Sequence, residues 1–217
     1  MLVVIIMNYK DILNSNYFNE TYSKIKELKK DFPVDHAFIH INNVIEYGKM
    51  CASIFKLNNK QKELLLIACC LHDIGYLNGR DNHAYTGSLL ASEYLLSNGF
   101  NNEDTNAICT AISNHGGKEL DNFSDPISLC LAISDKLDFT SSRYRIKDLE
   151  YPSNKIFPFI EENTLCYENN NLILKIKVRD GFDKDLFIES NYYKKLNDFF
   201  KLVCKVLKST FNIIYLY

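Results

Sequence analysis

The stretch Leu71-His72-Asp73-Ile74-Gly75 decides how the rest of this chain is interpreted. A histidine and an aspartate stand side by side at the end of an apolar run over residues 64–71, and a chain-breaking glycine follows. The last carbonyl groups of a helix have no partner within the helix and carry partial negative charge, which favours a cation. The pair therefore indicates a metal site at the end of a buried helix.

Further ligand-type residues fall on other predicted helices. They are His40, His83, His115 and Asp135. Asp135 stands in an apolar run, where an unpaired buried carboxylate would be costly unless a metal or a charge partner satisfied it. Imidazole and carboxylate donors without a thiolate suit Mn, Fe, Co, Ni, Zn or Mg rather than a structural zinc. The fifth histidine, His36, is interpreted as a helix-start residue near the surface, with a metal pair formed with His40 as the alternative.

Composition and charge limit the class of protein. The 217 residues are 47% hydrophobic and 24% charged, with a net charge of −2, so we expect one globular domain without a nucleic-acid or membrane partner. The seven cysteines are scattered and include no C-x-x-C pair, which favours a reducing cytoplasm over a disulfide framework. The apolar start is too short to span a bilayer, and Met7 is an alternative initiator to Met1.

Apolar spacing and capping residues predict a mainly α fold. The expected helices cover residues 8–30, 36–57, 59–72, 83–98, 102–115 and 126–138. The run over residues 64–71 is apolar on all sides, so its helix should be central. Small residues on the helix that begins at His83, Gly87 among them, would allow close approach to a neighbouring helix.

The pattern changes near residue 150. Residues 171–178 alternate apolar and charged side chains, which predicts a strand, and residues 164–168 are its expected hairpin partner. Residues 190–213 are predicted to form a basic amphipathic helix. The apolar end over residues 213–217 requires burial, and docking on its own chain is favoured over a homodimer contact. These segments are expected to join the helices in one domain over residues 1–217.

The spacing of these ligands resembles the HD-domain superfamily of metal-dependent phosphohydrolases. The H…HD…D motif falls on His40, His72, Asp73 and Asp135, and the resemblance covers about residues 36–145. It implies an HD helical bundle in which these four residues bind a primary metal. It further implies that His83 and His115 complete a second metal site or hold phosphate, so that one or two divalent ions bind.

Two features depart from parts of that superfamily. Many two-metal relatives carry a His-His pair where this chain has Asn114, His115 and Gly116. The G-Y-P signature of the cyclic-di-GMP branch is absent, which argues against that branch. The bacterial diadenosine tetraphosphate hydrolases share the order of ligands found here.

The predicted reaction is the hydrolysis of a phosphate ester of a nucleotide or a similar small metabolite. Metal-bound water loses a proton near neutral pH and can attack phosphorus. Asp73, His83 and His115 would take part, with Asp73 bridging two ions. Lys136 and Arg143 are candidate phosphate ligands, and the loop residues Arg80 and Lys118 are further candidates. An HD-fold di-iron oxygenase and a non-catalytic metal-binding regulatory module are the alternatives.

Overall fold

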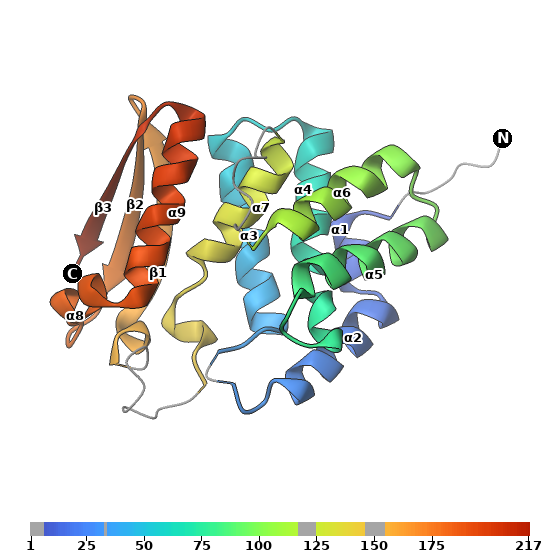
Figure 1. The fold of residues 1–217 in the computed structure, drawn as a ribbon, viewed down its shortest axis with the longest axis horizontal. Coiled ribbons are helices and arrows are strands. Elements are labelled where there is room, and N and C mark those ends of the chain that lie inside the picture. The colour runs from blue at the N-terminus through green and yellow to red at the C-terminus, as the bar shows by residue number, and fades with distance from the viewer. Residues whose placement is uncertain (1–6, 33, 117–124, 146–154) are drawn as a thin grey trace. The chain divides into compact units, whose positions relative to one another are not determined.

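The computed structural model describes residues 7–32, 34–116, 125–145 and 155–217 (Figure 1). These residues form two compact units. Unit 1 holds the described residues of Met1–Asp31 and His36–Asp135, and unit 2 those of Phe32–Asp35 and Lys136–Tyr217. The expected single domain over residues 1–217 stays a prediction. Among the described residues, none of the helices combines the length and apolar character needed to cross a bilayer.

Unit 1 is helical, as predicted. Its elements are α1 (Tyr9–Leu13), α2 (Asn16–Leu28), α3 (Phe38–Ile54), α4 (Asn59–Leu71), the 3-10 helix η1 (Ile74–Asn78), α5 (His83–Ser97), α6 (Asn102–Asn114) and α7 (Pro126–Leu137), whose last two residues are counted in unit 2. Figure 1 shows α4 among the other helices of this unit.

Helix α4 is central because its sequence is apolar around its whole circumference. Every residue from Leu64 to Leu71 is buried. The helix begins at a capping box, in which the Asn58 side chain accepts a hydrogen bond from the Gln61 amide and the Gln61 side chain accepts one from the Asn58 amide. The predicted burial is confirmed, and α4 ends at His72.

The predicted helix over residues 8–30 is wrong, because the structure breaks it into α1 and α2. Asn14 ends α1, and the Ser15 hydroxyl accepts a hydrogen bond from the Phe18 amide at 3.1 Å to cap α2. Short polar side chains compete with the helical backbone in this way, and they favour helix ends over helix interiors.

Unit 2 contains a three-stranded sheet and two helices. The elements are β1 (Ile160–Glu168), β2 (Asn171–Val178), α8 (Lys184–Glu189), α9 (Asn191–Leu207) and β3 (Thr210–Leu216). β1 and β2 form the predicted antiparallel hairpin, and β1 begins four residues earlier than expected. Asn169 and Asn170 make its turn with positive φ angles of 49° and 61°, a conformation that asparagine tolerates well.

The predicted helix over residues 190–213 is only partly correct. α9 ends at Leu207, Lys208 adopts a left-handed conformation, and the following residues form β3, which pairs in parallel with β2. Threonine, isoleucine and the aromatic residues of this segment favour strands. Phe211 stacks on Phe200 of α9 with ring centroids 4.7 Å apart, so this segment is docked within unit 2 as a strand, not as a helix end. The expected burial of residues 213–217 is partly wrong, because Ile214, Leu216 and Tyr217 are 42%, 45% and 82% exposed.

Candidate metal centre

Six predicted ligands converge in unit 1 from five helical elements. His40 lies in α3, His72 and Asp73 lie between α4 and η1, His83 begins α5, His115 follows α6, and Asp135 lies in α7. Four of them are buried, with exposed fractions between 0% and 2%: His40, His72, Asp73 and His115. The side chains of His83 and Asp135 are 22% and 16% exposed. Solvent therefore reaches the centre beside these two residues.

One group of donors surrounds the end of α4. The His40 Nε2 atom lies 3.1 Å from the His72 Nε2 atom and 3.4 Å from the Asp135 Oδ1 atom. The His72 Nε2 atom lies 3.9 Å from the same oxygen. Each of the three residues offers a donor atom within 4.8 Å of the others, so the group could hold a metal ion.

A second group lies on the other side of the Asp73 carboxylate. The His83 and His115 Nε2 atoms are 3.2 Å apart, and each lies 3.7 Å from Asp73 Oδ1. Asp73 Oδ2 lies 3.4 Å from His40 Nε2. The two oxygens of one carboxylate thus face both groups, which is the arrangement expected of a bridging ligand.

Three of the imidazoles are oriented by hydrogen bonds to the backbone. In each case the Nδ1 atom donates to the carbonyl oxygen three residues earlier, because a carbonyl can only accept. The pairs are His72 with Cys69 at 2.9 Å, His83 with Arg80 at 2.9 Å, and His115 with Ile112 at 2.6 Å. A neutral imidazole fixed in this way directs the Nε2 lone pair into the centre, as ligating histidines in proteins commonly do.

The electrostatics of the centre favour metal binding. Burial lowers the pKa of His72, and burial with the nearby His72 lowers the pKa of His115 to about 4, so both rings are neutral at neutral pH. Burial opposes ionisation of Asp73, but attraction to His72 and hydrogen bonds from His36 and His40 outweigh it and hold the pKa of Asp73 well below its ordinary value. Neutral imidazoles beside an ionised carboxylate fit a divalent cation.

Two glycines allow the centre to form. A Cβ atom added to Gly75 would lie 1.9 Å from the His83 carbonyl oxygen and 2.6 Å from the Gly87 amide nitrogen. A Cβ added to Gly87 would lie 3.2 Å from the His72 carbonyl oxygen. The backbones of η1 and α5 therefore touch, and this contact brings Asp73 and His83 together. The predicted close approach at Gly87 is confirmed, and Gly75 serves the same contact.

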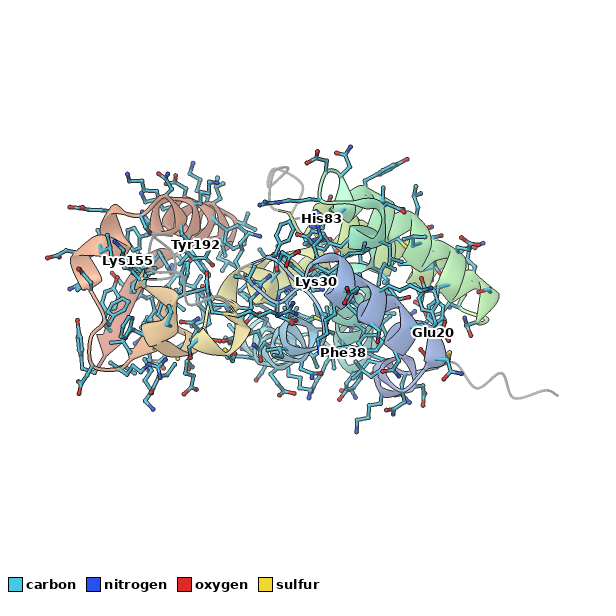
Figure 2. All side chains as sticks on the ribbon, turned by 90° about the horizontal axis from the view of Figure 1, so that it is seen from below. Glu20, Lys30, Phe38, His83, Lys155 and Tyr192 are labelled. Carbon is cyan, nitrogen blue, oxygen red and sulfur yellow. The ribbon has the colours of Figure 1, made fainter. Side chains whose placement is uncertain are left out.

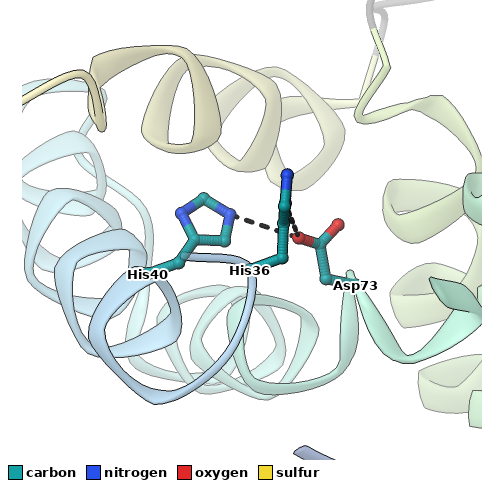
Figure 3. Close-up of side chains that lie close together, drawn as sticks. All are labelled: His36, His40 and Asp73. Atoms are coloured by element: carbon teal, nitrogen blue, oxygen red, sulfur yellow. Dashed lines mark hydrogen bonds and ion pairs between the residues drawn. The ribbon is translucent and has the colours of Figure 1, made fainter. Parts of the chain in front are cut away.

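His36 lies in the site, and its predicted position near the surface is wrong. Its side chain is only 15% exposed, and its Nδ1 atom lies 3.3 Å from Asp73 Oδ2. Figure 3 shows His36 and His40 directed at the same oxygen of Asp73. The alternative interpretation, a metal pair with His40, places His36 closer to its position in the structure, where the two histidines share the Asp73 carboxylate.

The two residues predicted to bind phosphate, Lys136 and Arg143, are assigned to unit 2. The Arg143 Nε and Nη1 atoms donate at 2.8 Å to the carbonyl oxygens of Asp35 and Asp138, so the guanidinium supports the backbone there. The Tyr192 hydroxyl, labelled in Figure 2, donates to the Lys136 carbonyl oxygen at 3.4 Å. Phosphate binding by Lys136 and Arg143 stays a prediction.

The two loop residues considered as further phosphate ligands are Arg80 and Lys118. Arg80 is exposed and holds His83 through its carbonyl oxygen, while phosphate binding by its side chain stays a prediction. Lys118 lies outside the described residues.

A known protein family matches the part of the chain that holds this centre. The model of the HD domain family matches residues 37–140, a segment that contains all six predicted ligands. The chain is similar to a solved structure of a predicted HD superfamily hydrolase from an uncultured Thermotogales bacterium, with 24% identity, a TM-score of 0.45, and coverage of 62% of this chain and 75% of that chain. No curated protein matches. The family match and the ligand motif within it identify residues 37–140 as an HD domain.

Proposed function

We propose that this protein is a metal-dependent hydrolase that cleaves a phosphate ester of a nucleotide or a similar small metabolite. The observation that carries the proposal is the convergence of four histidine Nε2 atoms on the Asp73 and Asp135 carboxylates, with three imidazoles fixed by backbone carbonyls. The resemblance to HD phosphohydrolases supports phosphate as the reacting group. Assays with one monoester and one diester distinguish the two kinds of substrate.

The residues divide between two metal positions. His40, His72, Asp73 and Asp135 would hold one ion, and His83, His115 and Asp73 a second. A divalent ion bound there supplies hydroxide near neutral pH and withdraws charge from a phosphoryl oxygen.

The protein contributes orientation and access. Backbone carbonyls keep His72 and His115 in one tautomer, so no reorganisation of these rings is needed when substrate arrives. Because the side chains of His83 and Asp135 are partly exposed while His40 and His72 are buried, we expect water and a small substrate to approach the centre past His83 and Asp135.

The test is hydrolysis of p-nitrophenyl phosphate and bis(p-nitrophenyl) phosphate by metal-free protein reloaded with Mn, Co, Fe, Ni, Zn or Mg. We expect p-nitrophenol release with at least one metal and its loss in His72→Ala and Asp73→Ala. Asp11→Ala removes an exposed carboxylate at the start of α1 and is the matched control.

Three results would contradict the proposal. Two bound irons with near-infrared absorption and oxygen consumption would indicate the oxygenase alternative. Metal-loaded protein without activity on either ester, and without oxygen consumption, would indicate a binding module. Full metal content in His72→Ala would show that the centre itself is assigned wrongly.

A further inference from the structure

We propose that His36 is a positioning residue of the metal centre, which donates its Nδ1–H to Asp73 Oδ2 and holds the bridging carboxylate in place. The proposal rests on the metal centre of the proposed function but not on the reaction that it catalyses. It assigns a fixed role to a fifth histidine, which lies outside the H…HD…D motif and ahead of the residues matched by the family model.

The direction of the hydrogen bond follows from the chemistry of the partner. A carboxylate that binds a metal ion is ionised, and an ionised carboxylate can only accept hydrogen bonds. The proton between His36 Nδ1 and Asp73 Oδ2, which are 3.3 Å apart, therefore belongs to His36. Hydrogen bonds to an ionised acceptor are about twice as strong as neutral ones, so this contact can restrain the carboxylate.

The orientation of His36 differs from that of three other histidines in the centre. His72, His83 and His115 turn Nδ1 toward backbone carbonyls and Nε2 toward the ligand cluster. His36 instead turns Nδ1 toward the cluster, so that a protonated nitrogen faces Asp73 (Figure 3). The other three histidines offer Nε2 to the cluster while the backbone holds Nδ1, whereas His36 offers Nδ1 to one carboxylate oxygen, and this difference favours a donor role for His36.

Tyr76 holds the His36 ring from the side. The two ring centroids are 4.6 Å apart, and Tyr76 also stacks on His83 at 4.3 Å with an interplanar angle of 15°. The Lys29 Nζ atom lies 4.8 Å from the Tyr76 centroid, and Tyr76 is only 6% exposed. One buried aromatic ring thus contacts the residue that orients Asp73 and a ligand of the second metal position, which couples the two sides of the centre.

The competing role is a metal ligand, because His36, His40 and Asp73 offer donor atoms within 4.8 Å of one another. Two substitutions separate the roles. His36→Asn keeps an N–H donor near the position of Nδ1 and is a poor ligand for these metals. His36→Phe keeps a ring against Tyr76 and removes the donor.

The experiment is calorimetric titration of metal-free protein with Mn²⁺, together with the absorption spectrum of the Co²⁺-loaded protein. We expect His36→Phe to weaken metal binding about 10- to 100-fold, the usual effect of losing an outer partner of a ligand, with unchanged stoichiometry. His36→Asn should bind within a few-fold of the natural protein and keep its Co²⁺ spectrum. Thermal unfolding without metal serves as the control for folding of each variant.

The outcomes are separable. A changed Co²⁺ spectrum or lower stoichiometry in both variants would make His36 a ligand and overturn the proposal. If both variants lose the same affinity for metal and keep the stoichiometry, the proposal is also overturned. The N–H donor that His36→Asn retains would then have no effect on metal binding. Unchanged binding in both would show that His36 has no role. None of these readouts uses a substrate, so they stand even if neither phosphate ester is hydrolysed.

Discussion

Among the single residues of the centre, His83 and His115 make the most direct test of a second metal position. Their Nε2 atoms lie 3.2 Å from each other and 3.7 Å from Asp73 Oδ1, whereas His40, His72 and Asp135 form a group that contains neither residue. We expect His83→Ala and His115→Ala to lower the metal content from two ions to one, because the first group keeps all its donors. Elemental analysis after equilibrium dialysis measures this. If the metal content stays the same and substrate binding weakens, both residues bind the substrate and not a second metal ion.

The buried His115 also predicts how stability depends on pH. Its pKa of about 4 lies below the value of about 6.5 in an unfolded chain, so the unfolded state binds more protons between these values. The free energy of unfolding of the metal-free protein should therefore be highest above pH 6.5 and fall as the pH drops toward 4. The slope from this residue approaches about 1.4 kcal/mol per pH unit. Urea unfolding in the presence of a chelator measures this pH dependence of the free energy of unfolding. An equal slope in His115→Gln would show that His115 does not cause it.

At the level of elements, the contact between η1 and α5 is the packing on which the centre depends. An alanine at Gly75 would push a methyl group into the His83 backbone, which cannot yield as a side chain can. We expect Gly75→Ala to lower the free energy of unfolding by about 3 kcal/mol and to weaken metal binding. Gly116→Ala is the matched control, because an added Cβ there meets no atom of the described residues within 4 Å. Equal stability of the two variants would show that the contact can relax.

The same elements show which parts of this structure the sequence could reveal. Local signals such as the apolar run of α4 and the alternation of β2 act within a few residues, and the sequence predicts both elements correctly. The pairing of β3 with β2 joins residues about 40 positions apart, and no local pattern encodes it. His36 was misplaced for the same reason, since only the fold brings Asp73 to it.

On the scale of the whole molecule, metal binding should be linked to the stability of unit 1, which holds every proposed ligand. A ligand that binds only the folded state at 100 times its Kd adds about 2.7 kcal/mol, and each kcal/mol raises the Tm of a protein of this size by about 2–4 °C. Scanning calorimetry should therefore show a transition that moves up with Mn²⁺ concentration and returns when a chelator is added. If unit 2 unfolds separately, its transition should stay in place. In His72→Ala the metal-dependent shift should disappear, and a shift of full size in that variant would mean that the stabilising ion binds elsewhere.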